Sequence, residues 1–305
     1  MPSATAWPNF LISLSYGIPS ILLYFLTFYM IIRHREPFKS SFFQLYVYDG
    51  IMNLFTYLIG LFKTRFSSVT CYDCLLGPFY RSIGDYISLN FVMAMNYHMA
   101  YIQYALTTLV SFNRLSVIME PTICEPIWQK YTWLLIVIVY FTPFLNTYCV
   151  FKYQALISYS NETDSYALVS PQLPLPDIFS VLIPFMVVSI IFSVASNITS
   201  IAIIRTMTIQ RRNEVETNFI IIMSITCTVQ LIGTIISLGT VNLAGTPVAK
   251  TLALILPFVS DGLTLVQPWL LICFSQRMRK QLKMAPRFKI KTTTSQLVLA
   301  RSTTT

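Results

Sequence analysis

Two aspartates stand inside long apolar runs that carry no other charge. Asp49 lies roughly halfway along the run 40–62, and Asp261 roughly halfway along the run 251–276. A carboxylate at the centre of a bilayer costs about 2.5–3.5 kcal/mol, so such groups face protein and usually pair. Asn53, one helical turn after Asp49, shares its face. These three side chains predict an intramembrane polar network that couples the two acids, either as a structural hydrogen-bond network or as a switch or ion site.

Asn113 and Arg114 come directly after another uncharged run, residues 86–112. A cation at this place can be an anchor whose long stem carries the charge to the membrane surface. It can also cap a closed helix bundle and meet a protein partner when the bundle opens. Arginine suits the second role because its guanidinium stays protonated and presents several donors. We therefore take Asn113 and Arg114 as the candidate coupling site.

Polar and aromatic residues recur along the run 86–112 at spacings of three or four, which is one face of a helix. Such a face can line a pocket that mixes aromatic area with a few polar groups. The alternative is that these residues only pack, and that the histidine is a satisfied interior side chain. The candidate pocket residues are Asn90, Met93, Asn96, Tyr97, His98 and Tyr101.

The sequence shows no pattern for catalysis or metal binding. Its two histidines, His34 and His98, are accompanied by no metal-binding cluster. There is no glycine-rich phosphate loop and no nucleophile elbow. We therefore expect a protein that is not an enzyme and has no metal and no cofactor.

Composition places the chain in a lipid bilayer. Of its 305 residues, 55% are hydrophobic and 11% charged, whereas soluble domains carry roughly a quarter charged residues. About 20 apolar residues of helix cross the hydrocarbon layer, and backbone groups in lipid must pair within the segment. We predict an all-α membrane protein, a seven-transmembrane helix bundle over residues 1–283 with a disordered tail over 284–305. The predicted spans are 10–32, 41–62, 86–112, 131–151, 178–204, 217–239 and 251–274.

The distribution of cations predicts the orientation of the bundle. With the N-terminus outside, sixteen of the 21 lysines and arginines fall in cytoplasmic segments and five outside, as the positive-inside rule requires. The net charge of +9 follows from this topology, so we expect no nucleic acid partner. Asn161 begins a glycosylation sequon in a predicted outer loop. A second sequon, at Asn197, lies within a span and should stay bare.

Phe274, Met278 and Leu282 recur at four-residue spacing after the last span, with cations between them. This pattern predicts a short amphipathic helix on the inner membrane surface; the alternative is an unstructured basic tail. Of the six cysteines, Cys71, Cys74 and Cys149 lie outside or at the outer edge, where disulfides persist. The other three, Cys124, Cys227 and Cys273, should remain thiols.

Several of these features resemble the G-protein-coupled receptors. Asn113-Arg114-Leu115 is similar to the Asp-Arg-Tyr motif of the rhodopsin-like class with only its arginine kept. The sequence QPWLL at 267–271 resembles Asn-Pro-x-x-Tyr without its tyrosine, and Asp49 matches the aspartate that binds sodium in many such receptors. The resemblance implies that Asn113 and Arg114 couple to a G protein. It also implies a disulfide between Cys149 and either Cys71 or Cys74.

A closer resemblance is to the nematode chemoreceptors of serpentine receptor class gamma. The motifs that carry it are LSYGIPS at 14–20, KSSFFQLY at 39–46 and DGIMN at 49–53, and the likeness covers residues 13–283. It implies a chemosensory receptor in the plasma membrane of sensory neurons or their cilia.

We therefore expect a receptor that binds a small external molecule and activates a heterotrimeric G protein. The alternative is a ligand-gated cation channel of the insect odorant-receptor kind, which is also seven-helical. That family has its N-terminus inside, which the cation distribution opposes. A transporter would be expected to show internal repeats, and none is visible.

Overall fold

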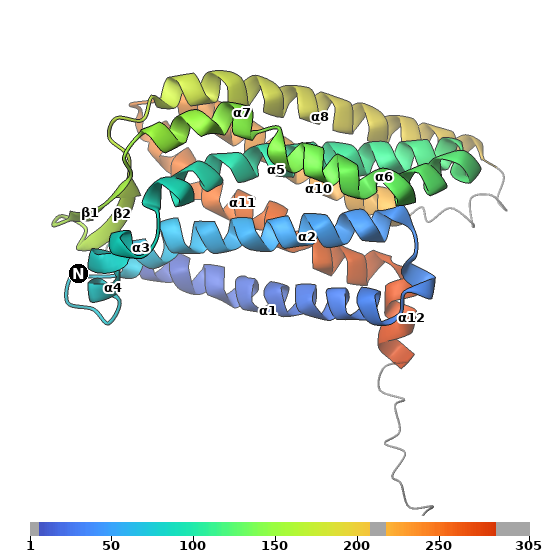
Figure 1. Cartoon of the computed structure of the whole chain (residues 1–305), viewed down its shortest axis with the longest axis horizontal. Helices are drawn as coiled ribbons and strands as arrows, with labels where there is room; N and C mark the ends of the chain where they lie inside the picture. Colours follow the sequence, from blue (N-terminus) through green and yellow to red (C-terminus); the bar gives the residue numbers. More distant parts are fainter. Residues whose placement is uncertain (1–5, 208–217, 285–305) are drawn as a thin grey trace, which may run out of the picture.

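The computed structural model describes residues 6–207 and 218–284, and it is mostly helical. Figure 1 shows the long helices running side by side in a bundle. They are α1 (Ala6–Arg33), α2 (Ser41–Gly60), α5 (Leu89–Met119), α6 (Pro121–Phe141), α8 (Leu175–Thr206), α10 (Asn218–Asn242) and α11 (Pro247–Phe274). The shorter elements are η1 (Glu36–Phe38), η2 (Leu61–Phe66), α3 (Ser67–Val69), α4 (Gly77–Ser82), η3 (Ile83–Asp85), α7 (Phe144–Thr147), η4 (Tyr148–Lys152), β1 (Leu156–Ser160), β2 (Ser165–Val169) and α12 (Gln276–Met284).

The apolar composition of the long helices defines a multi-pass membrane protein. Among the described residues, six segments are long and apolar enough to cross a membrane. These segments are Ala6–Arg33, Ser41–Val69, Pro121–Lys152, Leu175–Thr206, Asn218–Asn242 and Pro247–Phe274.

Helix α5 is not one of these six, although its 31 residues are more than long enough to cross. Its asparagines, tyrosines, histidine and glutamine lower its hydropathy. The helix packs against α2, α6, α8 and α10. A helix enclosed by other helices does not need an apolar face toward lipid, so its composition follows from its central position.

The two ends of the bundle differ in structure. Strands β1 and β2 form an antiparallel hairpin with Leu156 opposite Val169 and Ser160 opposite Ser165. This hairpin, α3, α4 and the start of α1 lie at one end, which we call the hairpin end, and α12 lies at the other, the α12 end (Figure 1).

Helix α12 is the amphipathic helix that the spacing of Phe274, Met278 and Leu282 predicts. It runs across the direction of the bundle at its end (Figure 1). The Met278 side chain is fully buried and Leu282 packs against the same core. The Arg277 guanidinium donates a hydrogen bond of 3.0 Å to the carbonyl of Pro37, so α12 is also fastened to the connection between α1 and α2.

Helix α6 begins ten residues before the predicted span 131–151. The segment between the predicted spans 86–112 and 131–151, which contains Glu125 and Pro126, is helical from Pro121 onward. Proline at the first helical position has no hydrogen-bonded N–H to lose, so Pro121 can open the helix. The helix then ends at Phe141, two residues before Pro143, because proline cannot continue the hydrogen-bond ladder.

Two of the predicted segments fall largely outside the described residues. The predicted third cytoplasmic loop, 205–216, is described only as far as residue 207. Of the predicted tail, 284–305, only Met284 is described, as the last residue of α12.

The exposure of the two sequons predicts that only one of them carries a glycan. Asn161 is exposed in the turn between β1 and β2, whereas Asn197 is buried in α8. We expect glycosidase treatment of the protein expressed in insect cells to increase its electrophoretic mobility. Asn161→Gln should abolish that shift, and Thr199→Ala, which destroys only the second sequon, should preserve it. A shift that survives in Asn161→Gln would contradict the prediction.

Candidate functional site

Asp49 is the centre of a buried polar cluster between α2 and α11. Its carboxylate accepts hydrogen bonds from Gln267 Nε2 at 2.5 Å and from Asn53 Nδ2 at 3.3 Å. The pairing of Asp49 with Asn53 is the one that their four-residue spacing predicts. Gln267 comes from the segment that resembles Asn-Pro-x-x-Tyr, so two motifs singled out in the sequence meet at one site. A cavity of about 20 Å³ adjoins this cluster.

The polar cluster continues from α2 through α5 into α10. Gln103 Nε2 donates to Asn53 Oδ1 at 3.2 Å, and Gln230 Nε2 donates to the Gln103 carbonyl at 3.3 Å. Tyr104 Oη then lies 2.9 Å from Thr234 Oγ1. We call this set, from Gln267 to Thr234, the central polar chain. It ties α11, α2, α5 and α10 together, and breaking one link leaves a buried polar group without its partner.

Asp261 belongs to a different cluster, nearer the hairpin end. Its Oδ2 lies 2.7 Å from Arg65 Nη2, and the side chains of this ion pair are 7% and 13% exposed. Tyr16 and Ser13 of α1 also donate to Asp261. The Arg65 guanidinium lies 4.3 Å from the centroid of the Phe258 ring. The charge of Asp261 is therefore neutralised by an arginine from η2.

The predicted coupling of Asp49 with Asp261 through the bundle interior does not pass through a hydrogen-bond partner shared within the described part of the chain, and it stays a prediction. The two carboxylates share no hydrogen-bond partner among the described residues. Asp49 bonds to amide groups on α2 and α11. Asp261 bonds to Arg65 on η2 and to hydroxyl groups on α1. The sequence alone does not assign Arg65 to this site, because it lies beyond the predicted span 41–62 in a segment expected outside the membrane. Its position only three residues beyond the apolar run 40–62 is the signal that could have found it.

Arg114 lies buried at the α12 end of α5. Its Nε and Nη2 donate to Asn113 Oδ1 at 3.0 Å and 2.7 Å. The guanidinium also lies 4.7 Å from the ring centroid of Phe42 on α2 and 5.4 Å from that of Phe219 on α10. These two rings are stacked with centroids 3.9 Å apart. Arg114 is thus enclosed by side chains from α2, α5 and α10, and does not extend outward as a snorkelling anchor would.

Asn113 connects the arginine to α2 and α6. Its Nδ2 donates to Ser41 Oγ at 2.9 Å, and Ser41 Oγ in turn donates to Glu125 Oε2 at 2.8 Å. The Ser41 backbone N–H donates to the other oxygen of Glu125 at 2.6 Å. The candidate coupling residues therefore join three helices at one end of the bundle through a continuous set of polar contacts.

The candidate pocket residues of α5 do not gather around one space. His98 is fully buried, with Nδ1 3.0 Å from Thr147 Oγ1 and Nε2 2.9 Å from the Tyr140 carbonyl. These contacts join α5 to α6 and α7. His98 is therefore a satisfied interior side chain and not a group that faces a pocket. Asn90 binds the segment before the hairpin, because its Oδ1 accepts from the Ala155 N–H at 2.8 Å and its Nδ2 donates to the Phe151 carbonyl at 3.3 Å.

Met93 and Tyr101 belong to different apolar clusters, and Tyr97 packs against both. Met93 is buried in a cluster with Val150 and Leu168, whereas the Tyr101 ring contacts that of Phe185 on α8. Tyr97 is partly buried, with its ring against Phe179 and the Lys63 ammonium 5.7 Å from its centroid. Asn96 is also partly buried. These contacts favour the packing interpretation for most of the set.

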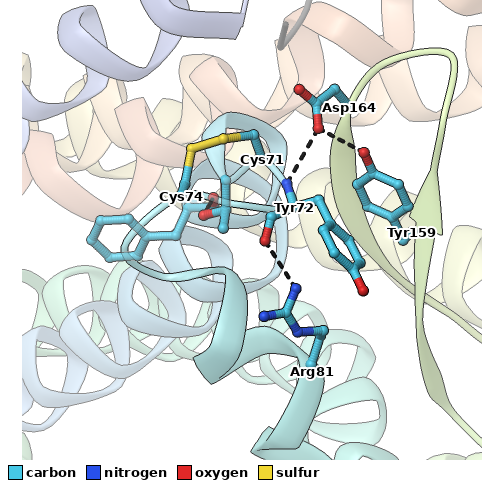
Figure 2. Close-up of a disulfide and its surroundings, with 8 residues drawn as sticks. Cys71, Tyr72, Cys74, Arg81, Tyr159 and Asp164 are labelled. Atoms are coloured by element: carbon cyan, nitrogen blue, oxygen red, sulfur yellow. Dashed lines mark hydrogen bonds between the residues drawn. A yellow bond between two sulfur atoms is a disulfide. The ribbon is translucent and has the colours of Figure 1, made fainter.

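The hairpin end is closed by a disulfide between Cys71 and Cys74 (Figure 2). Cys149 is a free, exposed thiol, so the bridge to Cys149 that the receptor resemblance implied is wrong in this structure. The cause is local: Cys71 and Cys74 lie in one turn with Cα atoms 5.1 Å apart, within the range that a disulfide spans. Cys124, Cys227 and Cys273 are free thiols, as expected.

Asp164 joins the disulfide turn to the hairpin (Figure 2). Its Oδ1 accepts from Tyr159 Oη at 2.6 Å and from the Tyr72 N–H at 3.2 Å. These hydrogen bonds, the one from Tyr159 first, hold the pKa of Asp164 below its ordinary value, and the same bond raises the pKa of Tyr159 to about 12. A lowered carboxyl pKa means that this contact is present at neutral pH and is lost only as acid protonates Asp164.

The apolar helices and the polar clusters enclosed between them describe a multi-pass membrane helix bundle. A family model described as Srg family chemoreceptor matches residues 10–282, so the chain belongs to that family. The resemblance seen at residues 14–20, 39–46 and 49–53 is thereby confirmed. The protein is a chemosensory receptor of the kind related to G-protein-coupled receptors, a class of proteins that are not enzymes.

Similar proteins of Caenorhabditis elegans carry the same family name. Serpentine receptor class gamma-31 is 27% identical over 280 residues, which cover 88% of this chain and 89% of the relative. Serpentine receptor class gamma-15 is 25% identical over 169 residues, 53% of this chain and 52% of the relative. Serpentine receptor class gamma-9 is 25% identical over 140 residues, 45% of this chain and 41% of the relative.

The separate acid clusters predict which substitutions combine additively. Removing one partner of a buried ion pair leaves an uncompensated charge and costs on the order of 3–5 kcal/mol. Arg65→Gln and Asp261→Asn should each lower the melting temperature of the purified receptor, and the double variant should melt no lower than the worse single variant. Asp49→Asn and Asp261→Asn share no partner, so their effects should add. Additive losses for the Arg65 and Asp261 pair would contradict this assignment.

Proposed function

We propose that this chain binds a small external molecule and signals through a heterotrimeric G protein. In this proposal helix α5 is the seventh crossing, so the two ends of the bundle lie on opposite sides of the membrane, with the N-terminus outside and α12 in the cytoplasm. The observation that carries the proposal is the enclosed Arg114 cluster at the α12 end of a chain of the Srg family. The protein belongs in the plasma membrane, and a sensory cilium is its expected place in a neuron.

Features at each end of the bundle support this orientation. The hairpin end has the disulfide and the exposed sequon at Asn161, both of which suit an extracellular environment. The α12 end has the basic helix α12 and Arg33, which terminates α1. Positive residues beside a span are favoured on the cytoplasmic side and are drawn to anionic lipid.

The Arg114 cluster is suited to report movement of the helices around it. The guanidinium is held between rings from α2 and α10, and Asn113 links it through Ser41 to α6. If α10 moves away from α2, the stacked pair of Phe42 and Phe219 separates and the donors of Arg114 become available to a partner. The energy for this movement comes from a ligand that binds the open arrangement more tightly than the closed one.

Arg114 substitutions test coupling separately from folding. Arg114→Ala should abolish second-messenger output while surface expression stays near that of wild type. Arg114→Lys should restore it only in part, because an ammonium cannot place two donors on Asn113 in the way the forked guanidinium does. Arg205→Ala is the matched control, since that arginine is exposed at the same end on α8. Full signalling from both Arg114 variants would exclude a coupling role.

Orientation distinguishes the proposed receptor from a channel of the insect odorant-receptor kind. An epitope tag before Ala6 should be labelled by antibody on intact cells, and a tag after Met284 only after permeabilisation. The reverse pattern would contradict the receptor proposal and favour the inverted channel. A tag placed in the hairpin turn at Glu162 serves as the internal control, because it must label on the same side as the N-terminal tag.

A further inference from the structure

A cavity of about 470 Å³ lies at the hairpin end, between the β1–β2 hairpin and the chain that leads from the disulfide to α5. Its lining combines aromatic rings with one residue of each charge: Tyr72, Tyr80, Arg81, Asp85, Tyr159 and Tyr166. Figure 2 shows Tyr72, Arg81 and Tyr159 of this lining beside the disulfide. The volume falls within the range of small-molecule sites, about 300–1,000 Å³.

One wall of the cavity is a continuous series of aromatic rings. The Tyr80 ring is stacked on that of Tyr166 with centroids 5.6 Å apart, and on its other side it is stacked on Phe62 at the same separation. Tyr166 then contacts Tyr159 at 5.2 Å, and Tyr159 contacts Tyr72 at 5.4 Å. Such a wall offers flat faces and edges against which another ring can stack.

The hydroxyl of Tyr166 is a buried polar group of this wall without a hydrogen-bond partner among the described residues. Tyr166 is 4% exposed, and its Oη makes no hydrogen bond among the described residues. By contrast, Tyr159 Oη donates to Asp164 at 2.6 Å, and Tyr80 Oη donates to the Phe62 carbonyl at 2.9 Å. A buried hydroxyl without a partner is costly and rare, so this site is complete only when something supplies an acceptor.

The charges at the cavity favour a neutral ligand. Arg81 and Asp85 are both exposed there, and they do not form an ion pair with each other within the described residues. Arg81 donates to the Tyr72 carbonyl at 3.0 Å and lies 4.4 Å from the centroid of the Tyr72 ring. One cation and one anion give the cavity no net charge, so neither an anion nor a cation is preferred.

We propose that this cavity binds a small neutral molecule that has an aromatic ring and a carbonyl or ether oxygen. The ring stacks on the tyrosine wall, and the oxygen accepts a hydrogen bond from Tyr166 after a small rotation of the hairpin. The inference deepens the proposed function and rests on it for the hairpin end being outside. The disulfide and Asp164 hold the turn that carries Tyr72 against the hairpin and so preserve this wall.

The test measures binding directly on purified full-length receptor in lipid nanodiscs, without a G protein. Saturation-transfer NMR detects weak binding of acetophenone, which is neutral, aromatic and has a carbonyl. Two matched probes are 4-acetylbenzoate, which adds a negative charge, and cyclohexyl methyl ketone, which keeps the carbonyl without the aromatic ring. Acetophenone should bind more tightly than either. Equal binding of all three probes, or no binding of acetophenone, would overturn the proposal.

Two variants locate the bound probe. Tyr166→Phe keeps the ring and removes the hydroxyl, so acetophenone affinity should fall by about threefold to tenfold, the range for one hydrogen bond. Gly84 also lines the cavity, and a Cβ there would meet only Leu89 Cδ1 at 3.5 Å, so Gly84→Leu should fill the space and abolish binding.

The control variant is Tyr148→Phe, since Tyr148 is exposed on η4 outside this lining. It should bind acetophenone as wild type does. Wild-type affinity in both Tyr166→Phe and Gly84→Leu would overturn the site. Binding that follows the prediction while every Arg114 variant signals normally would instead count against the proposed coupling and leave this site standing.

Discussion

The rest of the structure depends on one constraint: a polar side chain inside a helix bundle in lipid must find its partner within the bundle. Helix α5 has many such side chains, and several of them bond to its different neighbours. Asn113 reaches α2 and His98 reaches α6 and α7. Tyr104 reaches α10, and Thr108 Oγ1 lies 3.0 Å from Ser193 Oγ on α8. Hydrogen bonds depend on direction and apolar packing does not. These bonds therefore define the orientation of α5 within the bundle.

The same constraint separates the intramembrane charges into two independent sites. Asp49 is held by amide donors, which leave a small enclosed space beside the carboxylate. Asp261 is held by an arginine and two hydroxyl groups. The first arrangement joins α2 to α11, α5 and α10 through the central polar chain, whereas the second joins α1 and η2 to α11. A substitution at one site therefore perturbs different helices from a substitution at the other.

The two proposed functional sites lie at opposite ends of the bundle. The hairpin end offers a ring-lined cavity with an unsatisfied hydroxyl, and the α12 end holds an arginine enclosed by three helices. The central polar chain lies between them and shares α2, α5 and α10 with the Arg114 cluster. A change in helix spacing caused at one end can thus reach the other through elements that both ends share.

The sequence by itself determined the helical class, the membrane setting and the family. Long uncharged runs in lipid can form little other than helices, which gives the class and the membrane setting. The family is recognised from short motifs at 14–20, 39–46 and 49–53, which can be read without the fold. Local spacing also identified the pairing of Asp49 with Asn53 and the amphipathic helix around Met278, because both depend on helical periodicity alone. Arg65, by contrast, finds Asp261 from 196 positions away in the chain, and no periodicity reports such a pairing. Only the tertiary structure decided that His98 bonds to α6 and α7 and that Tyr166 lines a cavity, because both depend on how separate segments approach one another. It also decided between the possible cysteine pairs: Cys71 and Cys74 lie within bonding distance in one turn, and Cys149 is a free thiol.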